Sequence, residues 1–321
     1  MQVYETGFKT ELKSLASYFI VNNLNVISQE LDTRIADAAP FLLTGNRGKE
    51  YLKVVREGEK VMSQGERSFK FYPHVKVEGE TTIVAVDETA ITVGEKESRK
   101  VEGFQLYNGK RKGVKLRSVD LVFPLRLSLL EEIADLRSDT PSQFLMRAVS
   151  EVAQHLKIDY VVADAGFLNL KVIKEMPVKT VVGGKTNLKG FKELSNVPLT
   201  EKKCEVNDRV YVAYRVLKYN DLYYYEVIYV KEKPRHFIFV TNFNGDPYKL
   251  AELYRLRWQS EEGFKVRKAR IRYVRKLTNK IFLYLYYTVL DSVWNLVNYL
   301  LFNFKSTKRK PLSFNSFVRL L

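Results

Sequence analysis

The chain has 321 residues, of which 45% are hydrophobic, so it is long enough for one large domain or two to three smaller ones. Its one cysteine, Cys204, excludes an intrachain disulfide and an all-cysteine zinc site. This cysteine usage and the absence of a secretory signal pattern at the N-terminus favour the cytoplasm. The net charge of +16 predicts a polyanionic partner. Residues 241–321 carry 16 Lys and Arg against 5 Asp and Glu, which favours nucleic acid over an acidic membrane.

The first half of the chain predicts helices and then strands. Residues 8–62 have helical apolar spacing, and the alternating β-branched segment 81–93 predicts a strand. A basic turn over 107–117 precedes a strand region over 119–130. Asp139-Thr140-Pro141 is typical of a helix start, before the helical pattern of 142–156.

The second half begins with an alternation of strands and helices. A buried strand segment over 159–167, a helix over 168–176 and a strand over 178–184 are expected in turn. A β-rich block follows to residue 240, with strands separated by Asn-Asp and Lys-Pro turns.

The C-terminal part is expected to be helical. We expect the chain to become helical from Pro247 to about Val274, and a very apolar segment follows over 281–304. Asp291 and several asparagines interrupt that segment, which favours a core helix packed on the sheet over a membrane span. The whole pattern predicts an α/β core with an inserted β subdomain.

Two aspartates follow apolar strand segments. Asp87 ends IVAVD and Asp164 ends YVVAD. An unpaired charge inside a buried strand loses its hydration, but at the ends of adjacent strands two carboxylates can converge on a cation. Paired divalent ions on carboxylate oxygens can activate a nucleophile and stabilise a leaving oxygen in phosphoryl transfer. The alternative is that each aspartate only caps the turn or helix that follows it.

A third carboxylate lies in the segment YRLRWQSEEGFKVRK. At about 100° per residue, one side of the expected helix collects a tyrosine, a glutamate and several cations: Tyr254, Arg257, Glu261, Lys265, Lys268 and Arg272. Glu262 points elsewhere, so Glu261 is the preferred ligand. An exposed helix with intrahelical ion pairs is the alternative, but ten Lys and Arg lie between 254 and 280 against two Glu.

Together these motifs resemble the DDE transposases of bacterial and archaeal insertion sequences with the Tyr-x2-Arg-x3-Glu-x6-Lys signature. Tyr254, Arg257, Glu261 and Lys268 meet that signature in full. The DET at 87–89 is similar to the family's first-Asp motif, and ADAGF at 163–167 is similar to its second. One departure is Glu88, which stands where the family has a small residue and adds a competing carboxylate. The resemblance covers about residues 80–280.

The resemblance implies an α/β fold with an RNase H-like mixed sheet flanked by helices, a β-rich insertion and a helical N-terminal region. The 97 residues from Asp164 to Glu261 suit such an insertion, which in relatives shapes the site around a DNA hairpin intermediate. The expected parts are a helical region over 1–79, a core over 80–177, the insertion over 178–240, the rest of the core over 241–304 and a basic tail over 305–321.

The resemblance also implies the site. Asp87, Asp164 and Glu261 would bind two Mg²⁺ ions, which Mn²⁺ could replace. Arg257 and Lys268 would contact the DNA of the element ends, with Tyr254 assisting. The cations on the same helix side, Lys265 and Arg272, extend the predicted DNA-binding surface.

We therefore predict a cytoplasmic transposase that acts as a homodimer on double-stranded DNA, both element ends and target, without a membrane. No nucleotide cofactor is expected, because GGKT at 183–186 lacks the upstream glycine of a phosphate-binding loop: position 179 is Lys. One alternative is an RNase H-like nuclease that cuts without strand transfer. Another is a non-catalytic DNA-binding relic.

Overall fold

The computed structural model of the chain describes residues 67–71, 80–93, 106–108, 111–135, 138–206, 209–230, 233–272, 274–303 and 313. The helices predicted over 8–62 lie outside the described residues. The same holds for the basic tail over 305–321, apart from residue 313. Of the helical region predicted over 1–79, the structure describes residues 67–71, and these contain the strand β1 (Ser68–Lys70) and not a helix.

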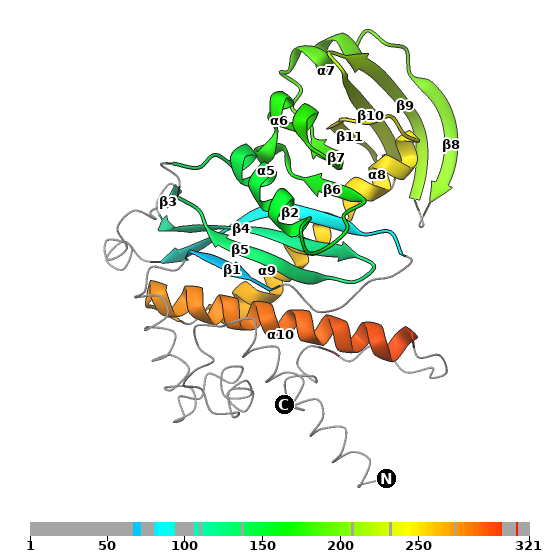
Figure 1. Cartoon of the computed structure of the whole chain (residues 1–321). Coiled ribbons are helices and arrows are strands. Elements are labelled where there is room, and N and C mark those ends of the chain that lie inside the picture. The colour runs from blue at the N-terminus through cyan, green and yellow to red at the C-terminus, as the bar shows by residue number, and fades with distance from the viewer. Residues whose placement is uncertain are drawn as a thin grey trace.

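The described strands form one mixed sheet of eleven strands (Figure 1). The strands are β1 (Ser68–Lys70), β2 (Ile83–Val93), β3 (Leu106–Asn108), β4 (Arg111–Phe123), β5 (Leu127–Ile133), β6 (Tyr160–Ala163), β7 (Lys179–Gly183), β8 (Thr200–Val206), β9 (Arg209–Tyr219), β10 (Leu222–Val230) and β11 (Pro234–Thr241). Their order is β1-β5-β4-β2-β6-β7-β11-β10-β9-β8, and β3 pairs with β4 off this path. β6 is parallel to both β2 and β7, whereas the other pairs are antiparallel.

The strands of the predicted insertion extend this same sheet. β11 pairs antiparallel with β7, with Phe239 opposite Gly183 and Thr241 opposite Val181. β10, β9 and β8 then follow outward and form the upper part of the sheet in Figure 1. β7 begins the predicted segment 178–240 and is also the last strand of the parallel part. The predicted domain boundaries stay a prediction.

Helices cover both faces of the sheet (Figure 1). They are α5 (Pro141–Val152), the 3-10 turn η2 (Ala165–Phe167), α6 (Leu170–Glu175), α7 (Lys189–Leu194), α8 (Pro247–Arg255), α9 (Trp258–Arg270) and α10 (Leu277–Asn303). α10 contacts β2, β5 and α9, and many of its side chains are buried, which confirms the predicted core helix. In the part of the chain that the structure describes, no helix is long and apolar enough to cross a membrane.

Two apolar cores lie on the two faces, and β2 contributes to both because side chains alternate along a strand. Val84 and Val86 pack in one core with side chains of α5. Ile83 and Ala85 pack in the other with side chains of α8. Asp87 continues the second series, so its carboxylate lies on the face that α8 and α9 cover.

Several local predictions are confirmed. α5 begins after Thr140, whose side chain accepts a bond from the backbone of Gln143 in a capping box, with Pro141 in the first turn. The Asn-Asp turn joins β9 to β10 with positive φ at Asn220 (50°) and Asp221 (62°). Both residue types tolerate that left-handed backbone conformation in a tight hairpin.

Three predictions are wrong. The basic turn over 107–117 is mostly strand, because β4 already begins at Arg111 and pairs with β2 along its length. The block after 184 contains α7 as well as strands, and its first strand, β8, carries mostly exposed polar residues that give no alternating signal. The continuous helical wheel used for residues 254–272 is interrupted, because the helical segment over 247–274 consists of two helices, α8 and α9, with a break at Leu256–Arg257.

Candidate active site

Asp87 and Asp164 lie next to each other because of the register between β2 and β6. In these parallel strands Val84 to Val86 lie opposite Val161 to Ala163, and an aspartate is the next residue of the chain in each case. The prediction that Asp87 ends a strand is wrong, since β2 continues to Val93. What ends at that point is β6, so beyond Val86 the strand β2 keeps only β4 as a paired neighbour.

Asp164 stands between β6 and the turn η2. It occupies the N-cap position of η2, but its side chain makes no capping hydrogen bond there. The carboxylate is 47% exposed, whereas that of Asp87 is 8% exposed. Simple capping therefore does not account for Asp164, and its side chain stays accessible to a ligand.

The break between α8 and α9 positions Arg257. Its backbone N–H donates to Tyr254 O at 3.3 Å and its carbonyl accepts from Ser260 N at 3.0 Å, both bonds of the 3-10 type. Tyr254 thus belongs to α8, and Glu261 lies in the first turn of α9. The break replaces the continuous helical wheel expected from the sequence, but it leaves these side chains on one side of the sheet.

Arg257 pairs with all three predicted carboxylates. Its Nη1 lies 2.7 Å from Asp87 Oδ2 and 2.7 Å from Glu261 Oε1, and its Nη2 lies 4.0 Å from Asp164 Oδ1. Asp87 Oδ2 and Glu261 Oε1 contact the same nitrogen, so the distance between these two oxygens is at most twice 2.7 Å. Three carboxylates from distant parts of the sequence thus surround one buried guanidinium.

The pKa values at this centre follow from burial and charge. Burial raises the pKa of Asp87 from 3.8 to about 6, although the guanidinium of Arg257 and the backbone N–H of Glu88 lower it. Burial lowers the pKa of Arg257, but Asp87 and the other acidic neighbours outweigh this, so its pKa lies above the usual value. The guanidinium is therefore a permanent cation beside an aspartate that titrates near neutrality.

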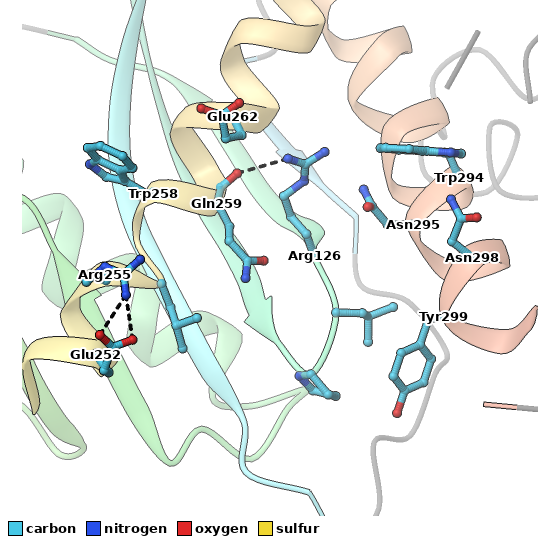
Figure 2. A pocket seen from close by; sticks show the side chains of 13 residues that line it. Arg126, Glu252, Arg255, Trp258, Gln259, Glu262, Trp294, Asn295, Asn298 and Tyr299 are labelled. Carbon is cyan, nitrogen blue, oxygen red and sulfur yellow. Dashed lines mark hydrogen bonds and ion pairs between the residues drawn. The ribbon is translucent and has the colours of Figure 1, made fainter. Parts of the chain in front are cut away.

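Glu261 and Glu262 face different surroundings. Glu262 is exposed, pairs with Lys265 and lines an open pocket of about 750 Å³ between α9, α10 and the β4–β5 connection (Figure 2). Trp258, 60% exposed, also lines this pocket. Of the two glutamates, Glu261 is the one that pairs with Arg257, in keeping with the choice made from the helical wheel.

Tyr254 packs against the strands that flank Asp164. Its ring stacks on Phe239 with a centroid distance of 6.0 Å, and its hydroxyl lies beside Gly183. A Cβ on Gly183 would come within 2.5 Å of that hydroxyl and 2.9 Å of Ala165 N. Glycine is therefore required at the end of β7 for Tyr254 to reach the backbone next to Asp164.

The predicted DNA-binding cations within α9 and just after it differ in burial. Lys265 and Arg272 are exposed, and Lys268 is half-buried. Burial and the guanidinium of Arg267 lower the pKa of Lys268, while Asp87 acts in the opposite direction. The charge of Lys268 thus interacts with that of Asp87.

Glu88 does not compete for the site. It lies directly opposite Arg117 in β4 and forms ion pairs with Lys115 and Arg117. Because neighbouring side chains of a strand point to opposite faces, its carboxylate is directed away from Asp87. The prediction of a competing carboxylate is therefore wrong.

Sequence reasoning missed a buried ionic cluster that anchors α9. Arg267 pairs with Glu131 of β5 and lies 4.0 Å from Asp120 of β4, and all three side chains are at most 2% exposed. Burial raises the pKa of Glu131 to about 8, against the effect of Arg267. Arg126 joins the β4–β5 connection to α10 through Asp291 at 2.8 Å and to α9 through Gln259 O at 3.2 Å. An acidic residue within the apolar run of β5 was the available signal.

Comparisons with known proteins identify the family of this chain and a solved structure with a similar fold. A family model described as Transposase DDE domain matches residues 78–290. No curated protein matches the chain. Among solved structures, the chain is similar to a piggyBac transposase in a synaptic complex with hairpin DNA, determined by cryo-EM. The TM-score is 0.52 at 10% identity, over 96% of this chain and 69% of that chain, so the likeness concerns the fold.

Proposed function

This chain belongs to the transposase DDE domain family, and we propose that it catalyses metal-dependent DNA cleavage and strand transfer at the ends of an insertion sequence. The observation that carries the proposal is the meeting of Asp87, Asp164 and Glu261 around Arg257. β2, the end of β6 and α9 supply one carboxylate each, and the single guanidinium among them leaves two negative charges that further cations can balance.

The fold supports the proposal. A mixed sheet with α5 on one face and α9 and α10 on the other is compatible with an RNase H-like core. In that core the parallel neighbours β2 and β6 would hold the two aspartates, and α9 would bring the glutamate to them.

The residues present fit divalent metal ions, which DDE transposases use. Asp87, Asp164 and Glu261 offer only carboxylate oxygens, the donors that Mg²⁺ and Mn²⁺ prefer. Among the described residues, no three side chains of His, Cys, Asp or Glu are grouped closely enough to hold a metal as they stand. The guanidinium of Arg257 lies between these carboxylates and must give way for two ions. When bound, the ions would activate the nucleophile and stabilise the leaving oxygen.

The proposed reaction has two steps, hydrolysis and strand transfer, and the second step leaves the number of phosphodiester bonds unchanged. A water oxygen attacks phosphorus at the element end, the bond from phosphorus to the 3′ oxygen breaks, and a 3′-hydroxyl is released. That hydroxyl then attacks a target phosphorus, displaces the target's 3′ oxygen and gives up its proton to it. Arg257 and Lys268 would neutralise the phosphate oxygens, and Tyr254 would hold the DNA near Asp164.

The partner is double-stranded DNA, at the element ends and at the target. The charge of residues 241–321 and the DNA-bound state of the similar piggyBac transposase support this choice. Joining two ends calls for two active sites, so we propose a homodimer on DNA, acting in the cytoplasm.

Glu261→Gln tests the catalytic role, and Glu262→Gln is the matched control on the same turn of α9. Both variants would be assayed with Mg²⁺ or Mn²⁺ on duplexes that carry the repeats flanking the element. Products would be resolved on a denaturing gel, which also separates nicked, joined and hairpin-closed strands. We expect metal-dependent joined products from the wild type and Glu262→Gln, and none from Glu261→Gln, although all three bind DNA.

Other outcomes separate the alternatives. Nicking without joined products would favour an RNase H-like nuclease. DNA binding without cleavage by any variant in either metal would leave a non-catalytic DNA-binding protein.

A further inference from the structure

A basic groove of about 620 Å³ lies between the end of β2 and the helices α9 and α10. Backbone and side chains of residues 90–93 form one wall. The other residues that line it include four cations, Lys265, Lys268, Arg272 and Lys280. None of the described residues that line the groove is Asp or Glu.

The cations reach the groove from two helices. Lys265 and Lys268 belong to α9, and Arg272 follows its C-terminus. Lys280 comes from the first turn of α10, and its ammonium donates to Thr92 O at 3.0 Å. That bond holds the Lys280 charge against the β2 wall of the groove.

The groove and the carboxylate centre both involve β2 and α9. β2 carries Asp87 and, five residues on, Thr92, which at about 3.3 Å per residue is a separation of about 17 Å. Lys268 lines the groove and also interacts electrostatically with Asp87. One DNA strand has a phosphate about every 3.4 Å along the helix axis, so this length corresponds to about five phosphates.

We propose that this groove binds the phosphate backbone of the DNA strand on one side of the reacting phosphate, and that Lys280 is a phosphate-binding residue of this track. The inference rests on the proposed function, because it takes the DNA to enter at the carboxylates. A polyanion suits a groove that is lined by four cations and by no described Asp or Glu. An ammonium is a compact point charge with several N–H groups, so Lys280 can bind a phosphate oxygen while it donates to Thr92.

The test is the salt dependence of DNA binding in EDTA, where catalysis does not enter. Lys280→Gln is compared with Lys174→Gln, which removes the same charge from α6 on the opposite face of the sheet. Each phosphate contact adds about 0.9 to the slope of log K against log salt. We expect Lys280→Gln to reduce the magnitude of that slope by about 0.9, the value of one phosphate contact, and to weaken DNA binding several-fold. Lys280→Arg and Lys174→Gln should keep the slope of the wild type.

Duplexes with single methylphosphonates then locate the contact. Neutral linkages are placed one at a time within six nucleotides on each side of the cleavage position. At one of them the wild type should lose affinity while Lys280→Gln loses none further, because the charge pair is already broken. Because Arg272 is exposed, Arg272→Gln provides a second measurement of the salt dependence of DNA binding if Lys280→Gln does not fold.

The outcomes distinguish the two proposals. A wild type that binds DNA, with Lys280→Gln and Arg272→Gln matching Lys174→Gln in slope, would overturn the groove and leave the proposed function standing. A wild type that binds no DNA would overturn both.

Discussion

Asp87→Asn should stabilise the metal-free protein at neutral pH, although it removes one partner of Arg257. The carboxylate is buried, and burial raises its pKa from 3.8 to about 6 in the folded state. A carboxyl group with a raised folded pKa supports folding fully below its unfolded pKa. That contribution is lost as the pH rises through the folded pKa.

The magnitude follows from the shift. One pKa unit corresponds to about 1.4 kcal/mol, so a rise of about two units costs on the order of 3 kcal/mol once Asp87 is ionised. The loss should occur between about pH 4 and pH 7. Asparagine does not titrate, so the free energy of unfolding of Asp87→Asn should gain this amount relative to the wild type over the same interval.

The measurement is urea unfolding of both proteins in EDTA at several pH values from 4 to 8. The difference in the free energy of unfolding between the two proteins cancels the contributions of groups that titrate alike in both. A difference that stays flat with pH would refute the reasoning. A variant that becomes relatively less stable as the pH rises would show instead that Arg257 dominates and depresses the pKa of Asp87. Added Mg²⁺ should stabilise only the wild type and so reduce the difference in the free energy of unfolding between the two proteins.

Three further substitutions probe the surroundings of the centre. Arg267→Met leaves Glu131 buried without its cation and should lower the free energy of unfolding by about 3 to 5 kcal/mol in urea; a loss below about 1 kcal/mol would contradict a structural role. Gly183→Ala should lower the melting temperature, because its Cβ would meet the tyrosine hydroxyl at 2.5 Å, while the control Gly166→Ala, with its nearest neighbour at 3.9 Å, should melt like the wild type. Arg257→Gln should bind Mn²⁺ more tightly without DNA by calorimetry, since no guanidinium then competes for the carboxylates; unchanged or weaker binding would argue against that competition.

The sequence was informative where chemistry and local pattern agree. A carboxylate directly after an apolar β-branched run is unusual enough to single out Asp87 and Asp164. The strand position of Asp87 was misjudged even though alternation continues through Ile91 and Val93. Whether a strand ends depends on its neighbours, and here β4 keeps pairing with β2 after β6 has stopped.

Non-local contacts account for the rest. The break at Leu256–Arg257 has no Pro or Gly to announce it, so a continuous helical wheel was the natural assumption. Likewise, the pairing of β11 with β7 joins the β-rich segment to the main sheet, and nothing within β8 to β11 specifies that partner. Arg267 looked like one more cation of a basic helix, because its partner Glu131 lies far away in the sequence.

The position of Arg257 links the stability of the centre to its proposed chemistry. With its three carboxylates ionised, the centre holds three negative charges and one guanidinium, a surplus of two negative charges partly shielded from water. Burial of Asp87 in this centre raises the free energy of the metal-free folded state, which is the cost that Asp87→Asn should relieve. The same surplus attracts divalent cations, and a metal that enters releases the guanidinium to pair with the phosphate the centre acts on. A centre arranged mainly for stability would have matched these charges, as the Arg126–Asp291 pair nearby does.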